Sequence, residues 1–286
     1  MAKGRELKGR IKSVENTKKI TRTMEMVATS KLKRANDRVI AARPFAAALR
    51  DVISSLYSPD LAERFPLLRQ PEQEGRAALV LLTSNRGLAG AFNANLIREA
   101  RTLLARLEAQ GTRVDLHVVG KKGAGYFRYL GRAMASNVID ITDRPTAADA
   151  ARLVDALMAD FIAGRLDSVY VVTAKFNSAL STPPTSEQVL PVRPPTRTGP
   201  QPDYLLFPDA ETILDELLPS YVRNQVYKAL VETAAGEQGA PRTAMKSATD
   251  NATEMLGILK RDFNRARQAQ ITQEIAEIVG GASALE

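Results

Sequence analysis

The 286-residue sequence predicts an α/β protein: a long antiparallel two-helix coiled coil from the N- and C-terminal helices, plus a doubly wound, mainly parallel α/β middle domain. Three observations predict this fold class. Apolar residues recur every three or four positions at both ends of the chain, which is the spacing of a helix seam. Short apolar runs alternate with helical patterns between them. Clusters of proline separate the ends from the middle.

The N-terminal segment, residues 1–58, is predicted as one helix from Ala2 to about Leu56. A seam, meaning the row of helix positions that packs against a partner helix, opens at Leu7, slips to a new row that includes Ile20 and Met24, and slips again before running unbroken from Leu32. Pro44 is compatible with a kink. At about 80 Å the helix is too long to lie on the core of its own domain, the alternative reading, so we expect it to pair with the C-terminal helix.

Prolines mark a linker over residues 59–75, and an α/β, Rossmann-like domain follows over residues 76–193. Buried strands are predicted where apolar runs are continuous, and helices where the spacing is three to four. The expected strands are 77–82, 114–119, a weaker one at 135–141, 168–173 and an edge at 189–192; the expected helices are 93–109, 123–130 and 146–163.

A second proline-rich linker covers residues 194–208, and a C-terminal coiled-coil helix with an apolar tip is predicted over 209–286. We expect its seam to use Met245, Ala248, Ala252, Met255 and Leu259 and then to stutter, which predicts a straight rod. At the tip the apolar residues spread around much of the helix, so protein is expected to cover them; they are Ile271, Ile275, Ala276, Ile278 and Val279.

The amino-acid composition excludes several kinds of functional site. The chain has no cysteine, which excludes disulfides and thiolate sites, and its single histidine makes an imidazole metal site improbable. The net charge is +8, and the first fifty residues hold 14 Lys and Arg against 4 Asp and Glu, so the basic excess belongs to the N-terminal helix. No apolar run has the length of a membrane span. We therefore expect no cofactor and no metal.

Two glycine-rich turns could hold a phosphate on backbone amides, one from Ser84 to Gly90 and one from Gly120 to Gly125. Neither matches a known nucleotide-binding pattern, so structural turns are the favoured interpretation. His117 lies in a strand run and is interpreted as packed or surface-facing. No catalytic set of residues is visible, and we predict that the chain is not an enzyme and has no small-molecule substrate.

Two function classes remain. A basic coiled coil could bind nucleic acid through its lysines and arginines, or act as a scaffold. Alternatively, the two helices are a mechanical or assembly element inside a larger complex. The bare apolar tip and the near absence of aromatic residues from the basic helix favour the second class, without nucleic acid.

Three stretches resemble signatures of the gamma subunit of F-type ATP synthases. They are residues 20–31 (ITRTMEMVATSK), residues 244–251 (AMKSATDN) and residues 264–279 (NRARQAQITQEIAEIV). Residues 84–90 are similar to the family's S-x-R-G-L-x-G. The resemblance spans the whole chain, and the chain is identified as a member of this family.

The resemblance implies a non-catalytic central-stalk rotor subunit that couples rotation of the c-ring to conformational change in the catalytic beta subunits. It implies alpha, beta and epsilon subunits and the c-ring as partners. The location implied is peripheral, on the cytoplasmic side of a bacterial plasma membrane. Met24, Arg267, Gln268 and Thr272 are expected to contact beta subunits, and Tyr204 to face the c-ring.

The sequence departs from the family pattern in two places. Phe207 stands where relatives often carry an acidic residue, which puts a charge contact with the c-ring in doubt there. Gly236, Gly239 and Pro241 stand in a run that is helix-compatible in the family. Because proline inside a helix costs about 3 kcal/mol, a bend or interruption is expected near Ala240.

Overall fold

The computed structural model describes residues 2–56, 64–71, 73–178, 180–193 and 209–283. Two helices, α1 (Ala2–Leu56) and α6 (Ala210–Ser283), hold the two ends of the chain. Between them come η1 (Pro66–Leu68), β1 (Arg76–Leu82), α3 (Phe92–Ala109), β2 (Arg113–Val119), α4 (Lys121–Tyr129), β3 (Ser136–Val138), α5 (Ala147–Ile162), β4 (Ser168–Ala174) and β5 (Pro184–Leu190). The predicted fold class is confirmed.

By compactness the chain divides into two units. Residues 1–28 and 241–286 form a two-helix unit, and residues 29–240 form an α/β unit. This division passes through α1 and α6, whereas the division predicted from the sequence followed the ends of the elements.

The α/β unit is built on a five-stranded sheet of order β3-β2-β1-β4-β5. The first four strands are parallel, and β5 runs antiparallel to β4 at the edge. The expected edge strand at 189–192 is therefore a longer strand that starts at Pro184, and the weak strand expected at 135–141 is only three residues long. Both differences lie at sheet edges, where half-buried residues give a weaker apolar pattern than a central strand.

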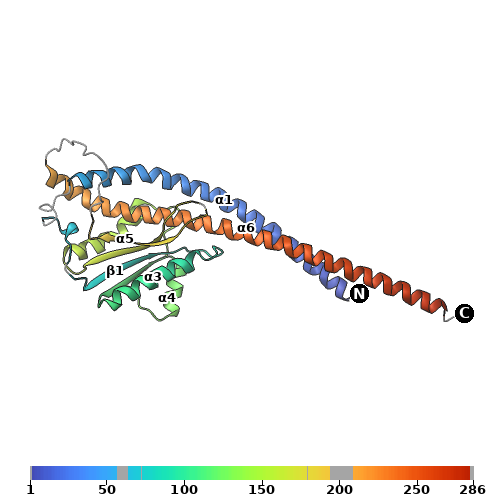
Figure 1. Cartoon of the computed structure of the whole chain (residues 1–286). Coiled ribbons are helices and arrows are strands. Elements are labelled where there is room, and N and C mark those ends of the chain that lie inside the picture. The colour runs from blue at the N-terminus through green and yellow to red at the C-terminus, as the bar shows by residue number, and fades with distance from the viewer. Residues whose placement is uncertain (1, 57–63, 72, 179, 194–208, 284–286) are drawn as a thin grey trace. The chain divides into compact units, whose positions relative to one another are not determined.

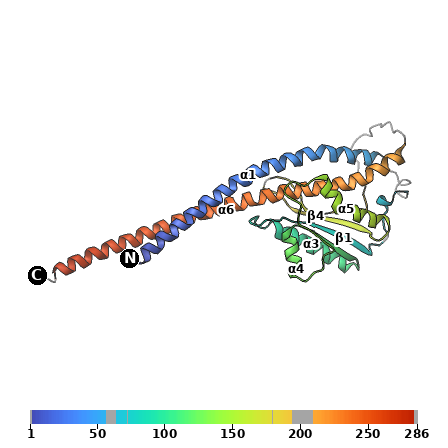
Figure 2. The ribbon, with the colours of Figure 1, turned by 180° about the vertical axis from the view of Figure 1, so that it is seen from behind.

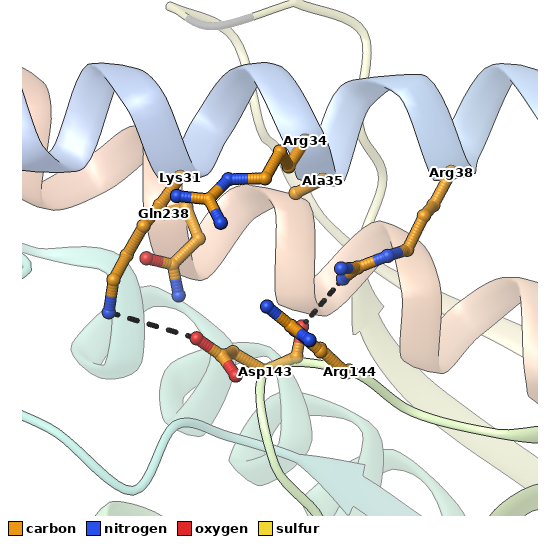
Figure 3. Close-up of a pocket in the computed structure, with 7 residues that line it drawn as sticks. All are labelled: Lys31, Arg34, Ala35, Arg38, Asp143, Arg144 and Gln238. Atoms are coloured by element: carbon orange, nitrogen blue, oxygen red, sulfur yellow. Dashed lines mark hydrogen bonds and ion pairs between the residues drawn. The ribbon is translucent and has the colours of Figure 1, made fainter.

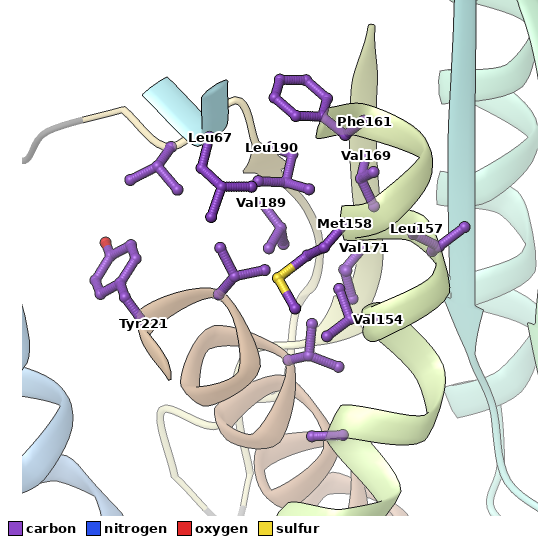
Figure 4. Close-up of a cluster of buried hydrophobic side chains, with 14 of the residues drawn as sticks. Leu67, Val154, Leu157, Met158, Phe161, Val169, Val171, Val189, Leu190 and Tyr221 are labelled. Atoms are coloured by element: carbon purple, nitrogen blue, oxygen red, sulfur yellow. The ribbon is translucent and has the colours of Figure 1, made fainter. Parts of the chain in front are cut away.

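Helices cover both faces of this sheet, as expected of a doubly wound fold. On one face α3 and α4 pack on side chains such as Leu79, Leu81 and Val118 (Figures 1 and 2). On the other face α5 packs together with the parts of α1 and α6 that belong to this unit. Figure 4 shows the second core, where Met158 of α5 lies beside Val171 of β4 and Phe161 lies near Val169.

Helix α6 is continuous through Gly236, Gly239 and Pro241, so the expected interruption near Ala240 is wrong. Close packing explains why position 236 is a glycine. A Cβ built at this position would lie 2.9 Å from Cε2 of Phe92 and 3.4 Å from Cβ of Ala174. The glycine lets the helix approach the α/β core closely, and this packing holds the helical conformation that local propensity disfavours. Helix α1 likewise continues through Pro44.

Candidate partner-binding surface

In the glycine-rich turn before α4, the backbone amides that could bind a phosphate are already hydrogen-bonded to other groups of the protein. The first amides of α4 all have partners: Lys121 N donates to Asn85 Oδ1 at 2.9 Å, Lys122 N to the Ser84 carbonyl at 3.2 Å, and Gly123 N to Thr83 Oγ1 at 3.0 Å. A Cβ at Gly120 would lie 2.1 Å from the Thr83 carbonyl oxygen. With its first amide donors used, and with Gly120 and Gly123 needed for close packing against Thr83, this turn has a structural role.

The single histidine also has a structural setting. His117 lies in β2, and its Nδ1 is 2.8 Å from Oγ of Ser136 on the neighbouring strand. Burial lowers the pKa of the imidazole, although Asp115 and Asp160 act in the opposite direction. Among the described residues, no group of three or more His, Asp or Glu side chains is placed to hold a metal ion. None of the described helices has a stretch apolar enough to cross a bilayer.

The two-helix unit pairs the start of α1 with the end of α6 in antiparallel orientation (Figures 1 and 2). Two cross-helix contacts fix the pairing. Thr21 Oγ1 and Thr249 Oγ1 lie 2.8 Å apart, and Lys260 Nζ lies 3.2 Å from Glu15 Oε1. Residues later in α1 therefore meet residues earlier in α6, and the register is defined by a hydroxyl pair inside the interface and an ion pair at its margin.

The covered positions of α1 form one regular row without slips. Within the two-helix unit the row contains Leu7, Ile11, Val14, Lys18, Thr21, Glu25 and Ala28. The slip expected at Ile20, Met24 and Val27 is wrong, because these three side chains are exposed, with 59%, 37% and 53% of their surfaces accessible. Lys18, Thr21 and Glu25 occupy the seam over the stretch where the apolar residues of the sequence shift to a different row.

The seam of α6 also differs from the one predicted from the sequence. A regular row of covered positions runs through Met245, Thr249, Ala252, Leu256, Leu259, Phe263, Ala266 and Gln270, in alternating steps of four and three. Ala248, expected in the seam, is half-buried like Thr249 beside it. Met255, expected in the seam, is 50% exposed, and Leu256 beside it is 7% exposed. The predicted stutter is therefore absent, and a regular repeat of this kind favours a left-handed supercoil over a straight rod.

The exposed apolar residues form rows of their own beside the seams. On α1 the row is Ile20, Met24 and Val27, and on α6 Met255 and Ile258 show the same helical spacing. Each lies one residue before a seam position, on a flank of the helix that the partner helix leaves open. Contiguous exposed apolar side chains mark interaction surfaces.

At the tip of α6 the apolar residues lie on a different side of the helix from the seam. From Ile271 to Gly280 every residue is exposed. The two positions that would continue the seam are polar, Gln273 and Glu277, and their side chains are hydrogen-bonded to each other at 2.9 Å. The apolar residues Ile271, Ile275 and Ile278 instead share a row beginning one residue after Gln270, the last covered position. An apolar row that leaves the seam where the seam becomes polar is suited to a partner outside this chain.

Three side chains expected to bind a partner lie where the seam ends and this tip begins. Arg267, Gln268 and Thr272, which we call the polar collar, are exposed. Gln268 and Thr272 lie two residues away from the seam positions Ala266 and Gln270, so they point away from α1. The Thr272 hydroxyl donates to the Gln268 carbonyl at 2.9 Å. The structure thus brings these three together, places Met24 on the α1 row, and leaves Tyr204 outside the described residues.

Comparisons with known proteins all point to one family. A family model described as ATP synthase matches residues 3–285. The chain is 68% identical to the ATP synthase gamma chain of Gemmatimonas aurantiaca over the full length of both chains. It is 45% identical to that of Frankia casuarinae, over 98% of this chain and 97% of the relative.

Solved structures give the same fold. The chain superposes with TM-score 0.70 and 18% identity on a chain of the Euglena gracilis mitochondrial ATP synthase, in a structure of OSCP, F1 and c-ring. That match covers 99% of this chain and 95% of the other. A chain from the central stalk and c-ring of the Tetrahymena thermophila enzyme matches with TM-score 0.61 and 24% identity, over 80% of this chain and 99% of that one.

Proposed function

Because the chain belongs to the ATP synthase family, in the branch whose members are named gamma chain, we propose that it is the central-stalk rotor subunit of a proton-translocating F-type ATP synthase. Its two-helix unit turns inside a hexamer of alternating alpha and beta subunits. The chain forms and breaks no covalent bond in this role. It couples c-ring rotation to catalysis by favouring a different conformation of each beta subunit at each rotor angle.

The observation that carries this proposal is the set of exposed apolar rows on the two-helix unit. Ile20, Met24 and Val27 on α1, and Ile271, Ile275 and Ile278 at the tip of α6, are between 37% and 71% exposed. So many large apolar side chains on one slender pair of helices favour a surrounding protein sleeve. The polar collar supplies directional donors and acceptors beside this apolar surface.

The partners proposed are the alpha, beta and epsilon subunits and the c-ring, with no nucleic acid and no small-molecule substrate. Beta-subunit contacts are assigned to Met24, Arg267, Gln268 and Thr272, and a c-ring contact to Tyr204. The chain would act as a peripheral subunit on the cytoplasmic side of a bacterial plasma membrane. Family membership and the resemblance of residues 20–31 and 264–279 to gamma-subunit signatures support these assignments.

The test compares Met24→Lys with Met24→Leu in the isolated chain and in complex with the alpha and beta subunits of the same organism. Because Met24 is exposed, neither substitution should shift the thermal unfolding of the isolated chain by more than a few tenths of a kcal/mol. In the complex a sleeve around Met24 would desolvate the new ammonium group, which is costly. Met24→Lys should then impair ATP-driven proton pumping, and Met24→Leu should not.

Equal pumping by the two variants would contradict a sleeve around α1. Failure of the wild-type chain to assemble with alpha and beta subunits, together with co-purification of nucleic acid, would instead support the nucleic-acid alternative, which the basic first fifty residues keep open.

A further inference from the structure

The α/β unit contains a cationic pocket that the proposed function does not use. It is a cavity of about 260 Å³ lined by Lys31, Arg34, Ala35 and Arg38 of α1, Asp143 and Arg144 before α5, and Gln238 of α6 (Figure 3). All seven residues lie within residues 29–240, the α/β unit. Four of these side chains are cationic and one is anionic, so the pocket carries a positive excess at neutral pH.

The single carboxylate does not neutralise this cluster. Lys31 Nζ lies 3.8 Å from Asp143 Oδ2. Arg38 Nη1 donates to the main-chain carbonyl of Asp143 at 3.2 Å, which is not a charged group. Arg34 Nη2 reaches only Ser30 Oγ, at 3.4 Å. Among the described residues, no carboxylate forms an ion pair with Arg34, Arg38 or Arg144. Three guanidinium groups around one cavity thus keep their charge available to a ligand.

We propose that this cationic pocket binds the phosphate group of a small anion, either free phosphate or the phosphate tail of a nucleotide. Arginine binds phosphate by paired, charge-assisted hydrogen bonds, and a lysine adds a point charge. Lys31, Arg34 and Arg38 are spaced three and four residues apart, so α1 presents all three on one side. The cavity is slightly smaller than usual drug-sized ligand sites, which suits a phosphate group better than a peptide segment.

A half-buried carboxyl beside the pocket makes the binding pH-dependent. Glu237, the neighbour of Gln238 on α6, faces charged groups on three other segments: Asp143, Arg86 and Lys31. Burial raises the pKa of Glu237 to about 7; Asp143 acts in the same direction, and Arg86 and Lys31 oppose it. Protonation of Glu237 removes a negative charge near the cavity, so anion affinity should increase as the pH falls from 8 to 6.

The experiment is calorimetric titration of the full-length chain with inorganic phosphate, sulfate and ADP at low ionic strength, where surface electrostatics are least screened. We expect saturable one-to-one binding with a dissociation constant of about 1 mM. Removing two charges in Arg34→Gln/Arg144→Gln should weaken each ligand about tenfold. The matched control is Arg113→Gln/Arg128→Gln, two exposed arginines of the same unit outside the pocket.

Tighter binding of ADP than of phosphate would identify a nucleotide tail as the ligand, and equal binding would identify the free phosphate group. Sulfate keeps its charge between pH 6 and 8, so a change in its affinity reports titration of the protein. That change should disappear in Glu237→Gln. Absence of saturable binding in the wild-type chain, or equal weakening by the two double variants, would overturn the site. A wild-type sulfate affinity independent of pH would overturn the role of Glu237 alone.

Discussion

At the scale of single residues, the environment of Glu237 has a consequence for stability. The folded protein holds its pKa at about 7, whereas the ordinary value is 4.5. Well below pH 4.5 the carboxyl is protonated in both the folded and the unfolded chain, so it has almost no effect on the free energy of unfolding. Above pH 7 it is ionised in both, and the folded protein carries the full cost of the buried charge.

Glu237→Gln should therefore stabilise the α/β unit at pH 8 by about 1–3 kcal/mol and leave its stability at pH 4 almost unchanged. The glutamine imitates the protonated carboxyl in size and charge. The chain has no tryptophan, and its seven tyrosines all lie within residues 29–240, so tyrosine fluorescence during urea unfolding reports on this unit. An equal gain at both pH values would show that charge burial is not the cause.

Gly236 and Gly257 offer a matched pair on the same helix. Glycine costs about 1 kcal/mol relative to alanine inside a helix, so local propensity alone predicts that either Gly→Ala change is stabilising. At Gly257 a Cβ meets nothing within 4 Å, and we expect that gain. At Gly236 the Cβ would lie 2.9 Å from the buried ring of Phe92, and overpacking costs about 1–3 kcal/mol.

We accordingly expect Gly236→Ala to be net destabilising by about 1 kcal/mol and Gly257→Ala to be stabilising. Tyrosine fluorescence measures the first variant, and amide hydrogen exchange near residue 257 measures the second. Stabilisation by Gly236→Ala would mean that Phe92 can move aside, and the packing explanation of this glycine would then be wrong.

At the scale of the elements, the polar part of the two-helix seam can be tested. Thr21, only 8% exposed, shares a 2.8 Å hydrogen bond with Thr249. Thr21→Val or Thr249→Val alone leaves the other hydroxyl without its cross-helix partner and should cost about 1 kcal/mol. The double variant replaces both polar groups by apolar ones of similar shape and should cost less than the sum of the single changes.

Hydrogen exchange of the amides of residues 241–260 in all four proteins gives the coupling energy, which we expect to be about 0.5–1.5 kcal/mol. Additive effects would show that the two hydroxyls do not act as a pair. A single polar pair in a seam can fix the register of two helices, and this pair is the candidate for that role here.

The same seam shows how far the sequence could predict the elements. Continuous apolar runs such as 77–82 predicted the central strands correctly, because a strand buried on both faces has no competing pattern. In the two-helix unit there were two apolar rows on each helix with the same spacing, one covered and one exposed. Periodicity alone could not separate them, and Lys18, Thr21 and Glu25 concealed the true seam.

The surface proposed to bind partners was predictable to a similar degree. The tip residues and the polar collar could be identified from their unusual composition and from the family signature. The α1 row was mistaken for part of the seam, and only the position of α6 reveals that Met24 is open to a partner. The cationic pocket had no sequence signal, because its lining comes from positions 31–38, 143–144 and 238, which are brought together only by folding.

At the scale of the whole molecule, the polar collar and the apolar tip should differ in how they transmit torque. Apolar contact is not directional, so a tip turning in an apolar sleeve would have little preference for angle. The guanidinium of Arg267 and the amide of Gln268 make directional hydrogen bonds, and a charge-assisted bond is worth about 1.5–3 kcal/mol. Thr272 already donates to the Gln268 carbonyl, so Arg267 and Gln268 are the freer donors.

The comparison is between Arg267→Ala/Gln268→Ala and a truncation after Glu277, each reassembled with alpha and beta subunits on the membrane sector. The truncation removes exposed Ile278 and Val279 and leaves the collar intact. Because only directional contacts can distinguish one beta subunit from the next, the double substitution should lower steady-state ATPase and ATP-driven proton pumping more than the truncation does. Greater loss in the truncated chain would place the torque-bearing contact at the apolar tip.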